Sequence, residues 1–186
     1  HIGEHYSEGG YAVLWDESGE SIALMERVTR NGEFSVQTVV SGDYTLSEDA
    51  KTATFMGLGL VANEASEGST FDYVVISPSS VVNMDTENHS VVGLALPTVQ
   101  KPKVDSYDPN ASILVGSSLG NGEQKDVVEA DLTHILAYAK MTVKNVPTDD
   151  KIETVEFITE KDIYGTVLKY NIEDGTVGSD SSIMLV

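Results

Sequence analysis

Residues 130–146, ADLTHILAYAKMTVKNV, form the longest stretch of the chain in which apolar residues dominate without a glycine or a proline. In its second half, Ala137, Ala139, Met141 and Val143 alternate with Tyr138, Lys140, Thr142 and Lys144. Because this period of two is typical of a half-buried strand and the first half is apolar on both faces, the stretch predicts a long central strand. Its start would be covered on both faces, and its end would be exposed to water on one face.

A helix is the competing interpretation of the same stretch. Its apolar residues also fall at spacings of three and four, and Leu, Ala and Lys favour helices. The residues at this spacing are Val128, Leu132, Ile135 and Ala139. Since a short apolar run is ambiguous by period alone, the sequence leaves this alternative open.

Short apolar runs separated by turn residues lie on both sides of this stretch. Asn31-Gly32 is a hairpin signal, and residues 16–20 would join two strands at 11–15 and 21–25. Further strands are predicted over residues 33–40, 52–58, 71–76, 90–96, 113–115, 152–159 and 163–172. Many short strands without helical patterns predict an all-β fold, a single antiparallel β-sandwich domain of about seven to ten strands over residues 1–186.

The charge of the chain is strongly acidic, with 30 Asp and Glu against 11 Lys and Arg and a formal net charge of -19. Such a field repels phosphate groups, which argues against nucleic acid and anionic lipid as partners. There is no cysteine, which excludes disulfides and cysteine-based metal sites, and no apolar run is long enough to span a bilayer. The chain begins at His1 without a signal-like segment, so we expect any targeting segment to lie outside this sequence.

The most specific match to a catalytic motif is the G-x-S-x-G pattern of residues 116–120, which would make Ser118 the nucleophile and His134 the base. Two acids, Asp126 and Asp131, lie between them. The motif requires a helix directly after the serine, whereas Gly120-Asn121-Gly122 follows here. A phosphate cradle ending at Lys125 lacks the G-K-[ST] order. The sequence therefore predicts a flexible surface loop over 116–124 and no catalytic residue.

Metal and cofactor sites have little support in the sequence. His1 and His5 could bind a transition metal only adventitiously, at the start of the chain. The acidic stretches 85–88 and 149–150 could hold calcium, but neither matches the D-x-[DN]-x-[DN]-G loop. We therefore predict no metal and no cofactor, and we expect His134 to pack as a neutral histidine that donates one hydrogen bond to a backbone carbonyl.

Four motifs follow one another over residues 15–170. They are Trp15-Asp16 with Gly19-Glu20-Ser21-Ile22; Phe71-Asp72-Tyr73 in a run ending at Pro78; Leu96-Pro97-Thr98-Val99-Gln100 with Tyr107-Asp108-Pro109 and Ile113-Leu114-Val115; and Leu132-Thr133-His134-Ile135-Leu136-Ala137 with Met141-Thr142-Val143. In this order they resemble the fimbrillin-like proteins, the subunits and accessory proteins of type V pili of Bacteroidales-type bacteria. The chain departs from the family's pattern where Glu20 replaces Asp, Ser77 replaces Tyr and Leu132 replaces an aromatic residue.

This resemblance implies a transthyretin-like β-sandwich, the N-terminal domain of a longer two-domain protein whose boundary lies near residues 178–186. It also implies an exported lipoprotein of the outer membrane or fimbrium, with the lipid anchor upstream of His1 and no membrane span of its own. Such subunits are trimmed at a basic site; Arg27 and Arg30 both follow the Trp15 strand, so the position of this site stays open.

The function implied by the resemblance is a non-enzymatic fimbrial subunit or accessory protein that mediates cell adhesion. Its partners would be other pilus subunits, joined by β-augmentation, together with host or bacterial surface ligands. The alternative is a surface glycan-binding module. An exposed row of aromatic residues around Trp15, Tyr107 or Tyr164 would support this alternative. A hydrolase at Ser118 is the third hypothesis.

Overall fold

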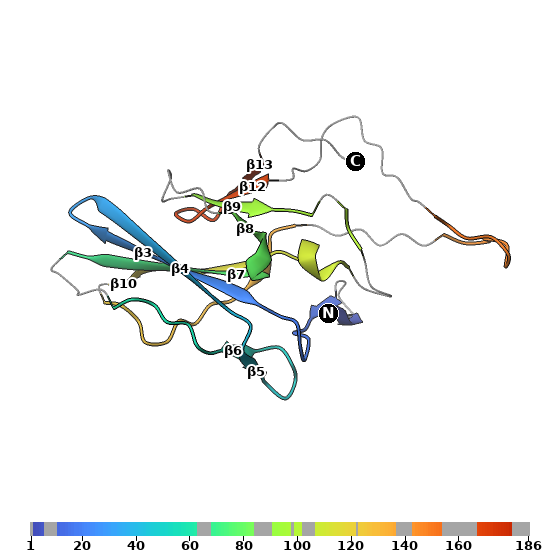
Figure 1. Ribbon diagram of the computed structural model, residues 1–186, viewed down its shortest axis with the longest axis horizontal. Helices are drawn as coiled ribbons and strands as arrows, with labels where there is room; N and C mark the ends of the chain where they lie inside the picture. Colours follow the sequence, from blue (N-terminus) through green and yellow to red (C-terminus); the bar gives the residue numbers. More distant parts are fainter. Residues whose placement is uncertain are drawn as a thin grey trace.

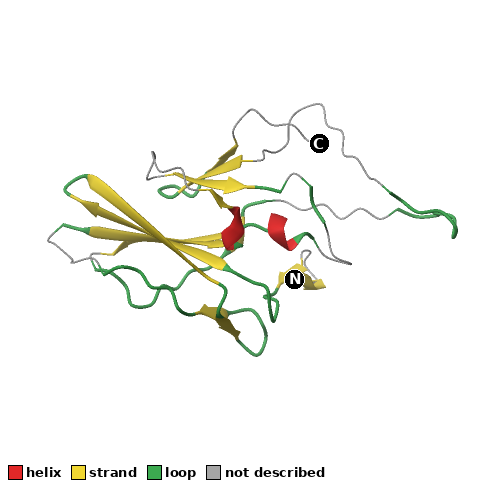
Figure 2. Ribbon diagram, viewed as in Figure 1, coloured by secondary structure: helices red, strands yellow, loops and turns green. Residues whose placement is uncertain are grey.

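The computed structural model of the 186-residue chain describes residues 2–5, 11–62, 68–83, 91–97, 99–101, 107–121, 123–136, 143–153 and 167–179. These residues form antiparallel strands and two single turns of 3-10 helix, η1 (Ser79–Val81) and η2 (Pro109–Ala111) (Figure 2). The predicted all-β class is confirmed. Neither of these helical turns approaches the length of a membrane-spanning helix.

The larger sheet has five strands in the order β11-β10-β7-β3-β4. Their bounds are Thr133–His134 for β11, Leu114–Asn121 for β10, Thr70–Ser77 for β7, Ile22–Arg30 for β3 and Glu33–Ser41 for β4. β3 and β7 are buried along almost their whole length, so both faces of the sheet are covered at its centre. Their near-continuous apolar runs are those expected of strands covered on both sides.

A second sheet of four strands, in the order β13-β12-β9-β8, covers one face of the first (Figure 1). It contains β13 (Val177–Ser179), β12 (Val167–Asn171), β9 (Val91–Ala95) and β8 (Val82–Asn83). Buried side chains of both sheets meet in one core cluster, with Met25, Val74, Ile76 and Val115 on one side and Val92, Leu94, Leu168 and Tyr170 on the other. The two sheets thus form a sandwich-like pair.

The opposite face of the five-stranded sheet carries a second core cluster formed by Ile22, Leu24, Val28, Phe71, Tyr73 and Val75. No second sheet covers this face in the described part of the chain. Side chains from the small hairpin β5 (Tyr44–Leu46) and β6 (Ala53–Phe55), from residues 56–62 and from residues 126–132 pack on it instead. The remaining two strands, β1 (Ile2–His5) and β2 (Tyr11–Val13), pair with each other.

The hairpin predicted from Asn31-Gly32 is confirmed. β3 and β4 pair up to Arg30 and Glu33, and the two turn residues have φ angles of 51° and 82°, as a type I′ turn requires. Strands also occupy the predicted ranges 33–40 and 71–76, and β9 covers residues 91–95 of the predicted range 90–96. The predicted hairpin across residues 16–20 is wrong, because β2 pairs with β1 while β3 pairs with β4 and β7.

Other predicted strands are shorter than expected or only partly described. The range 52–58 is reduced to β6, and 163–172 contains β12, with residues 163–166 outside the described part. Residues 152 and 153 are not in a strand, and the rest of the range 152–159 is not described.

The predicted long central strand over 130–146 is wrong in the residues that the structure describes. Only β11 is a strand there, and it lies at an edge of the sheet, paired with β10 alone. Residues 143–153 are exposed and form no strand, projecting from the body (orange in Figure 1), and residues 137–142 lie outside the described part. The alternative helix is also absent from residues 123–136.

The physical reason is that this stretch crosses the edge of the sheet rather than its centre. Leu132 packs in the cluster on one face, whereas Ile135 and Leu136 pack in the cluster on the other. Because its consecutive side chains fill two different core clusters, the segment is apolar throughout. Its sequence therefore resembles that of a strand buried on both faces.

The flexible loop predicted over 116–124 is wrong for residues 116–121, since β10 continues through Asn121, whereas residues 123 and 124 lie outside any strand. Pairing with β7 holds this stretch in the sheet despite its glycines and serines. Gly116 has a specific role there: a Cβ atom at this position would lie 2.7 Å from the carbonyl oxygen of Asp131 and 2.8 Å from Leu132 Cδ2. The absence of a side chain lets residues 131–132 lie directly over β10.

We expect Gly116→Ala to lower the free energy of unfolding by about 1–3 kcal/mol, because the added methyl group must displace the backbone of Asp131 as well as the end of the Leu132 side chain. Urea unfolding followed by circular dichroism measures this change. Gly178→Ala in β13 is the matched control, because a Cβ atom added there would have no neighbour within 4 Å and the substitution should be nearly neutral. Equal effects of the two substitutions would contradict the close approach at Gly116.

Candidate functional site

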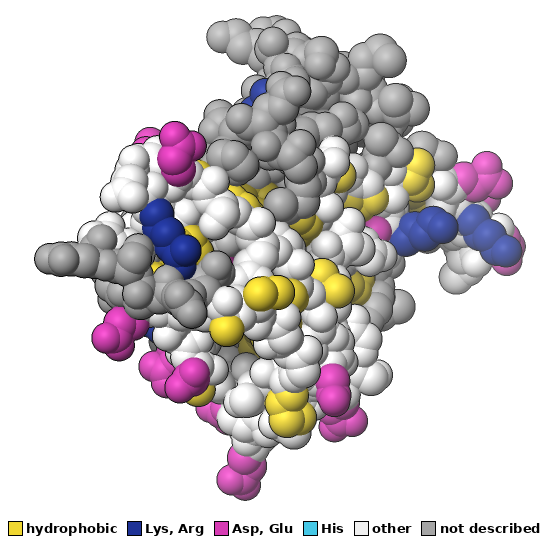
Figure 3. Space-filling model, turned by 60° about the vertical axis from the view of Figure 1, so that its left-hand side comes forward, with side chains coloured by type: hydrophobic (Ala, Val, Ile, Leu, Met, Phe, Trp, Pro, Cys, Tyr) yellow, Lys and Arg dark blue, Asp and Glu magenta, His cyan; other side chains and the backbone are white. Residues whose placement is uncertain are grey.

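A groove with a volume of about 1360 Å³ lies on the face of the five-stranded sheet over which the described residues form no larger sheet than the β5–β6 hairpin. Its floor is formed by Ile22 and Leu24 of β3, Val75 of β7 and Leu114 of β10. Residues 57–62 and the β5–β6 hairpin form one wall, and residues 124–132 form the other. On the face shown in Figure 3, hydrophobic side chains are exposed between acidic ones, which lie around the margin.

One end of the groove is built on Glu26, which is completely buried in the middle of β3. Its cross-strand neighbours on the same face are Gln37 of β4 and Tyr73 of β7. The amide Nε2 of Gln37 donates to Glu26 Oε1 at 2.6 Å, and the Nε2 of Gln124 donates to Glu26 Oε2 at 2.9 Å. These four residues, Glu26, Gln37, Tyr73 and Gln124, are named the Glu26 cluster below.

The Glu26 cluster ties both walls of the groove to the sheet. The backbone N–H of Val61 donates to Gln37 Oε1 at 2.8 Å, and both Gln37 and Gln124 donate to the Val61 carbonyl oxygen at 3.0 Å. The backbone N–H of Lys125 donates to the Tyr73 hydroxyl oxygen at 2.7 Å. Burial raises the pKa of the Tyr73 hydroxyl, and the Glu26 carboxylate adds to this rise, so the hydroxyl keeps its proton.

The other end of the groove is aromatic. The rings of Trp15 and Phe55 meet edge-to-face with centroids 5.5 Å apart, and Tyr44 lies 5.0 Å from Phe55. The Tyr44 hydroxyl donates to the carbonyl oxygen of Asp16 at 2.7 Å, which fixes the turn that carries Trp15. Trp15 and Tyr107, two aromatic candidates from the sequence, are both brought to this groove, whereas Tyr164 lies outside the described residues.

His134 lines the same end of the groove and packs edge-to-face on Tyr107, with ring centroids 5.7 Å apart. The predicted packing role is therefore confirmed, but the predicted hydrogen bond to a backbone carbonyl is not formed among the residues that the structure describes. Burial lowers the pKa of His134 and raises that of Tyr107. Both groups are thereby kept neutral near pH 7.

The lowered pKa of His134 predicts a pH-dependent stability. Because the folded state favours the neutral ring, its contribution is complete above the unfolded pKa of about 6.5 and is lost as the pH falls through the folded pKa. The urea midpoint of the wild type should decline between pH 7.5 and pH 5. His134→Phe keeps a ring against Tyr107 and should show a smaller decline, whereas equal declines would contradict the assignment.

Ser118 and His134, the nucleophile and base considered from the sequence, are not brought together. His134 pairs with Leu114, four residues along β10 from Ser118, a separation of about 13 Å at the usual rise of a strand. Ser118 also lies within β10, with no helix after it, so the geometry is not that of a nucleophile elbow. Its hydroxyl instead accepts a hydrogen bond from Lys125 Nζ at 2.9 Å, which fastens residue 125 to the sheet.

Comparisons with family models, with curated proteins and with solved structures find no match for this chain. The resemblance to fimbrillin-like proteins therefore depends on the sequence motifs alone.

The metal candidates receive no support from the described residues. Asp149 and Asp150 are exposed in a turn, whereas His1 and residues 85–88 lie outside the described part. Among the residues that can be placed, no three His, Cys, Asp or Glu side chains form a group that could hold an ion.

Glu26, Gln37 and Gln124 were not singled out by the sequence. The only local signal is a charged residue inside the apolar run of β3, which by itself does not identify its partners. Gln124 is 98 positions away from Glu26 along the chain, so the contact depends on the packing of residues 123–132 over the sheet.

Proposed function

We propose that this chain is a non-enzymatic fimbrial subunit or accessory protein that mediates cell adhesion and assembles with other pilus subunits by β-augmentation. It would be exported to the cell surface as the N-terminal, transthyretin-like domain of a longer protein with a lipid anchor upstream. The observation that carries the proposal is the groove on the face of the five-stranded sheet that has no second sheet over it among the described residues.

The groove has the chemistry that strand addition requires. In β-augmentation, main-chain hydrogen bonds supply affinity and alternate side chains fill pockets that define the register. The floor is apolar, and its volume of about 1360 Å³ exceeds the range of about 300–1,000 Å³ that is usual for small-molecule sites. An extended segment of a neighbouring subunit fits this shape better than a small ligand.

The experiment that tests assembly is size-exclusion chromatography with light scattering on the longest native form, before and after limited cleavage by an Arg-specific protease. Growth of SDS-resistant ladders after cleavage supports the proposal, and a monomer throughout would contradict assembly by trimming. Arg27 is only 6% exposed in the folded domain, so cleavage at this residue is not expected.

A surface glycan-binding module is the second candidate, favoured by the presence of Trp15 and Tyr107 in one groove. Aromatic faces beside polar groups are the usual platform for sugar rings. A glycan array with the wild type and Trp15→Ala tests this function: binding that disappears in the variant supports it, and absence of wild-type binding argues against it.

A further inference from the structure

We infer that the backbone of residues 126–132 is the edge that accepts a partner strand, and that this strand carries apolar residues at every second position and Lys or Arg at the positions between them. The inference rests on the proposed function and adds the accepting edge, the partner's chemistry and the point where the partner strand ends.

The backbone of residues 126–132 is open for pairing. It forms no hydrogen bond to the other residues that the structure describes. Residues 126 and 127 form an exposed bend, and from residue 128 the side chains alternate, with Val128, Ala130 and Leu132 packed toward the sheet and Glu129 and Asp131 exposed. This period of two is that of extended backbone, whose N–H and C=O groups point sideways, where a neighbouring strand forms its ladder. The carbonyl oxygen of Asp131 is the exception, because it lies against Gly116 of β10.

The opposite wall of the groove, residues 57–62, offers fewer open backbone groups than residues 126–132. The N–H and C=O groups of Val61 are already bonded to Gln37 and Gln124, and the N–H of Leu60 donates to the Leu58 carbonyl oxygen at 3.1 Å. This wall therefore contributes apolar surface through Leu58 and Leu60, whereas residues 126–132 contribute the hydrogen-bonding edge.

The charges around the groove indicate which side chains the partner strand carries on the face that points away from the sheet. Asp126, Glu129 and Asp131 are exposed along the accepting edge, and Asp16 and Glu20 line the aromatic end. Two lysines also line the groove: Lys125 Nζ donates to the Ser118 hydroxyl at 2.9 Å, and Lys51 Nζ lies 3.6 Å from Asp49 Oδ2. Five acidic residues line the groove against these two lysines, so the field at the groove favours a basic partner. Since side chains directly opposite each other on neighbouring strands interact, a basic residue beside Glu129 or Asp131 is favoured and an acidic one is disfavoured.

The Glu26 cluster defines where the partner strand ends. It joins Gln124 to Val61 across the groove, so the two walls meet there, next to the first residue of the accepting edge. The extended part of this edge is the five residues 128–132, about 17 Å at the usual rise of a strand. A partner strand thus approaches from the end at Trp15 and Tyr107 and is stopped at the Glu26 cluster.

Synthetic nine-residue peptides test the partner's chemistry on the full chain. The first is Lys-Val-Thr-Val-Lys-Val-Thr-Val-Lys, the second has Glu in place of each Lys, and the third has the first peptide's composition with the valines adjacent. Binding is followed by calorimetry and by the fluorescence of Trp15, the single tryptophan, which lines the groove. We expect the first to bind at least about tenfold more tightly than the others at low salt, with the difference from the Glu peptide shrinking at high salt.

Proline substitutions test the accepting edge. Neighbouring N–H groups of an extended segment point to opposite sides, so Glu129→Pro and Ala130→Pro each remove one donor, from different sides of the edge. One of the two substitutions should abolish binding of the first peptide, while the other should leave its dissociation constant within about threefold of the wild-type value. The circular dichroism spectrum should be unchanged in both variants. Loss in both variants or in neither would overturn the assignment of residues 126–132.

The outcomes separate this inference from the proposed function. A chain that forms SDS-resistant ladders but binds the three peptides equally or not at all overturns the inference and leaves the fimbrial proposal intact. A chain that binds the first peptide selectively but stays monomeric supports the inference and counts against assembly.

Discussion

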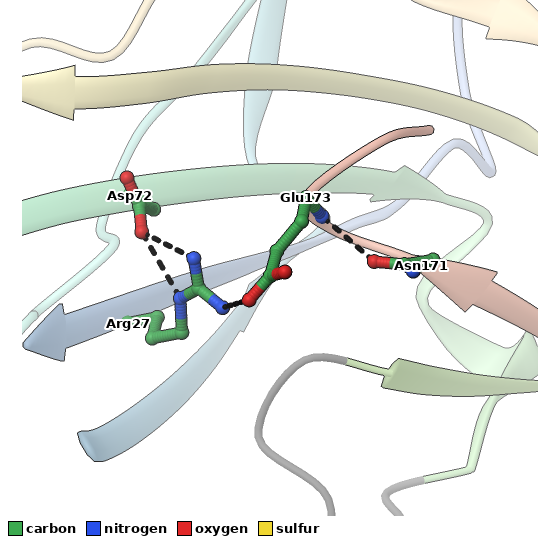
Figure 4. Close-up of polar contacts among 4 residues, drawn as sticks. All are labelled: Arg27, Asp72, Asn171 and Glu173. Atoms are coloured by element: carbon green, nitrogen blue, oxygen red, sulfur yellow. Dashed lines mark hydrogen bonds and ion pairs between the residues drawn. The ribbon is translucent and has the colours of Figure 1, made fainter. Parts of the chain in front are cut away.

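Replacement of Asp72 by Asn should lower the free energy of unfolding by about 3–5 kcal/mol. Arg27 Nε and Nη2 both donate to Asp72 Oδ2, at 3.0 and 2.6 Å, and the two side chains are only 8% and 9% exposed (Figure 4). Since Asn has the same shape but no charge, it removes the buried counter-charge of the guanidinium and leaves only the exposed carboxylate of Glu173. Urea unfolding measured by circular dichroism gives the change.

Two variants show whether the loss comes from the buried charge. The other acid on Arg27 is Glu173, whose carboxylate accepts from Nη1 at 3.3 Å and whose side chain is 57% exposed. Glu173→Gln should therefore cost at most about 1 kcal/mol. The double variant Arg27→Met with Asp72→Leu removes both charges and should recover most of the stability. If Asp72→Asn costs no more than Glu173→Gln, the ion pair does not stabilise the fold as the geometry predicts.

Replacement of Glu26 by Ala should cost about 2–5 kcal/mol and should also release the walls of the groove. The substitution removes the acceptor for the amides of Gln37 and Gln124, and a buried donor left without an acceptor costs about 1–3 kcal/mol. Because the two donors share one network, their costs are not additive.

Hydrogen exchange separates release of the walls from a general loss of stability. The N–H groups of Val61 and Lys125 are bonded to Gln37 and Tyr73, so both should exchange faster in Glu26→Ala relative to amides in the centre of β7. Glu48→Ala, at an exposed loop position, is the matched control and should leave all of these rates unchanged. Uniform acceleration throughout the sheet would show that the cluster stabilises the fold without holding the walls.

The candidate site was predicted only in part. Trp15 and Tyr107 were considered as an aromatic platform and His134 as a packing histidine, and the structure places all three at one end of the groove. Ser118 lies apart from His134 in space, and the stretch around it, predicted as a loop, is a strand, because pairing with β7 outweighs the local preference of glycine and serine for turns.

Local patterns determined what the sequence could show by itself. The all-β class follows from many short runs with period two, and the β3–β4 hairpin follows from Asn31-Gly32, which accommodates the two positive φ angles of its turn. These features depend on neighbouring residues and backbone sterics, so they can be read without knowledge of distant partners.

The tertiary structure alone decided which strands are central and where the groove lies. The contacts that decide this join residues far apart in the chain: Arg27 and Asp72 are 45 positions apart, and Glu26 and Gln124 are 98 positions apart. Apolar periodicity shows that a side chain is covered but not what covers it, because burial depends on total packing. The apolar stretch 130–136 was therefore taken for the centre of the sheet, when in fact it crosses the edge and fills both cores.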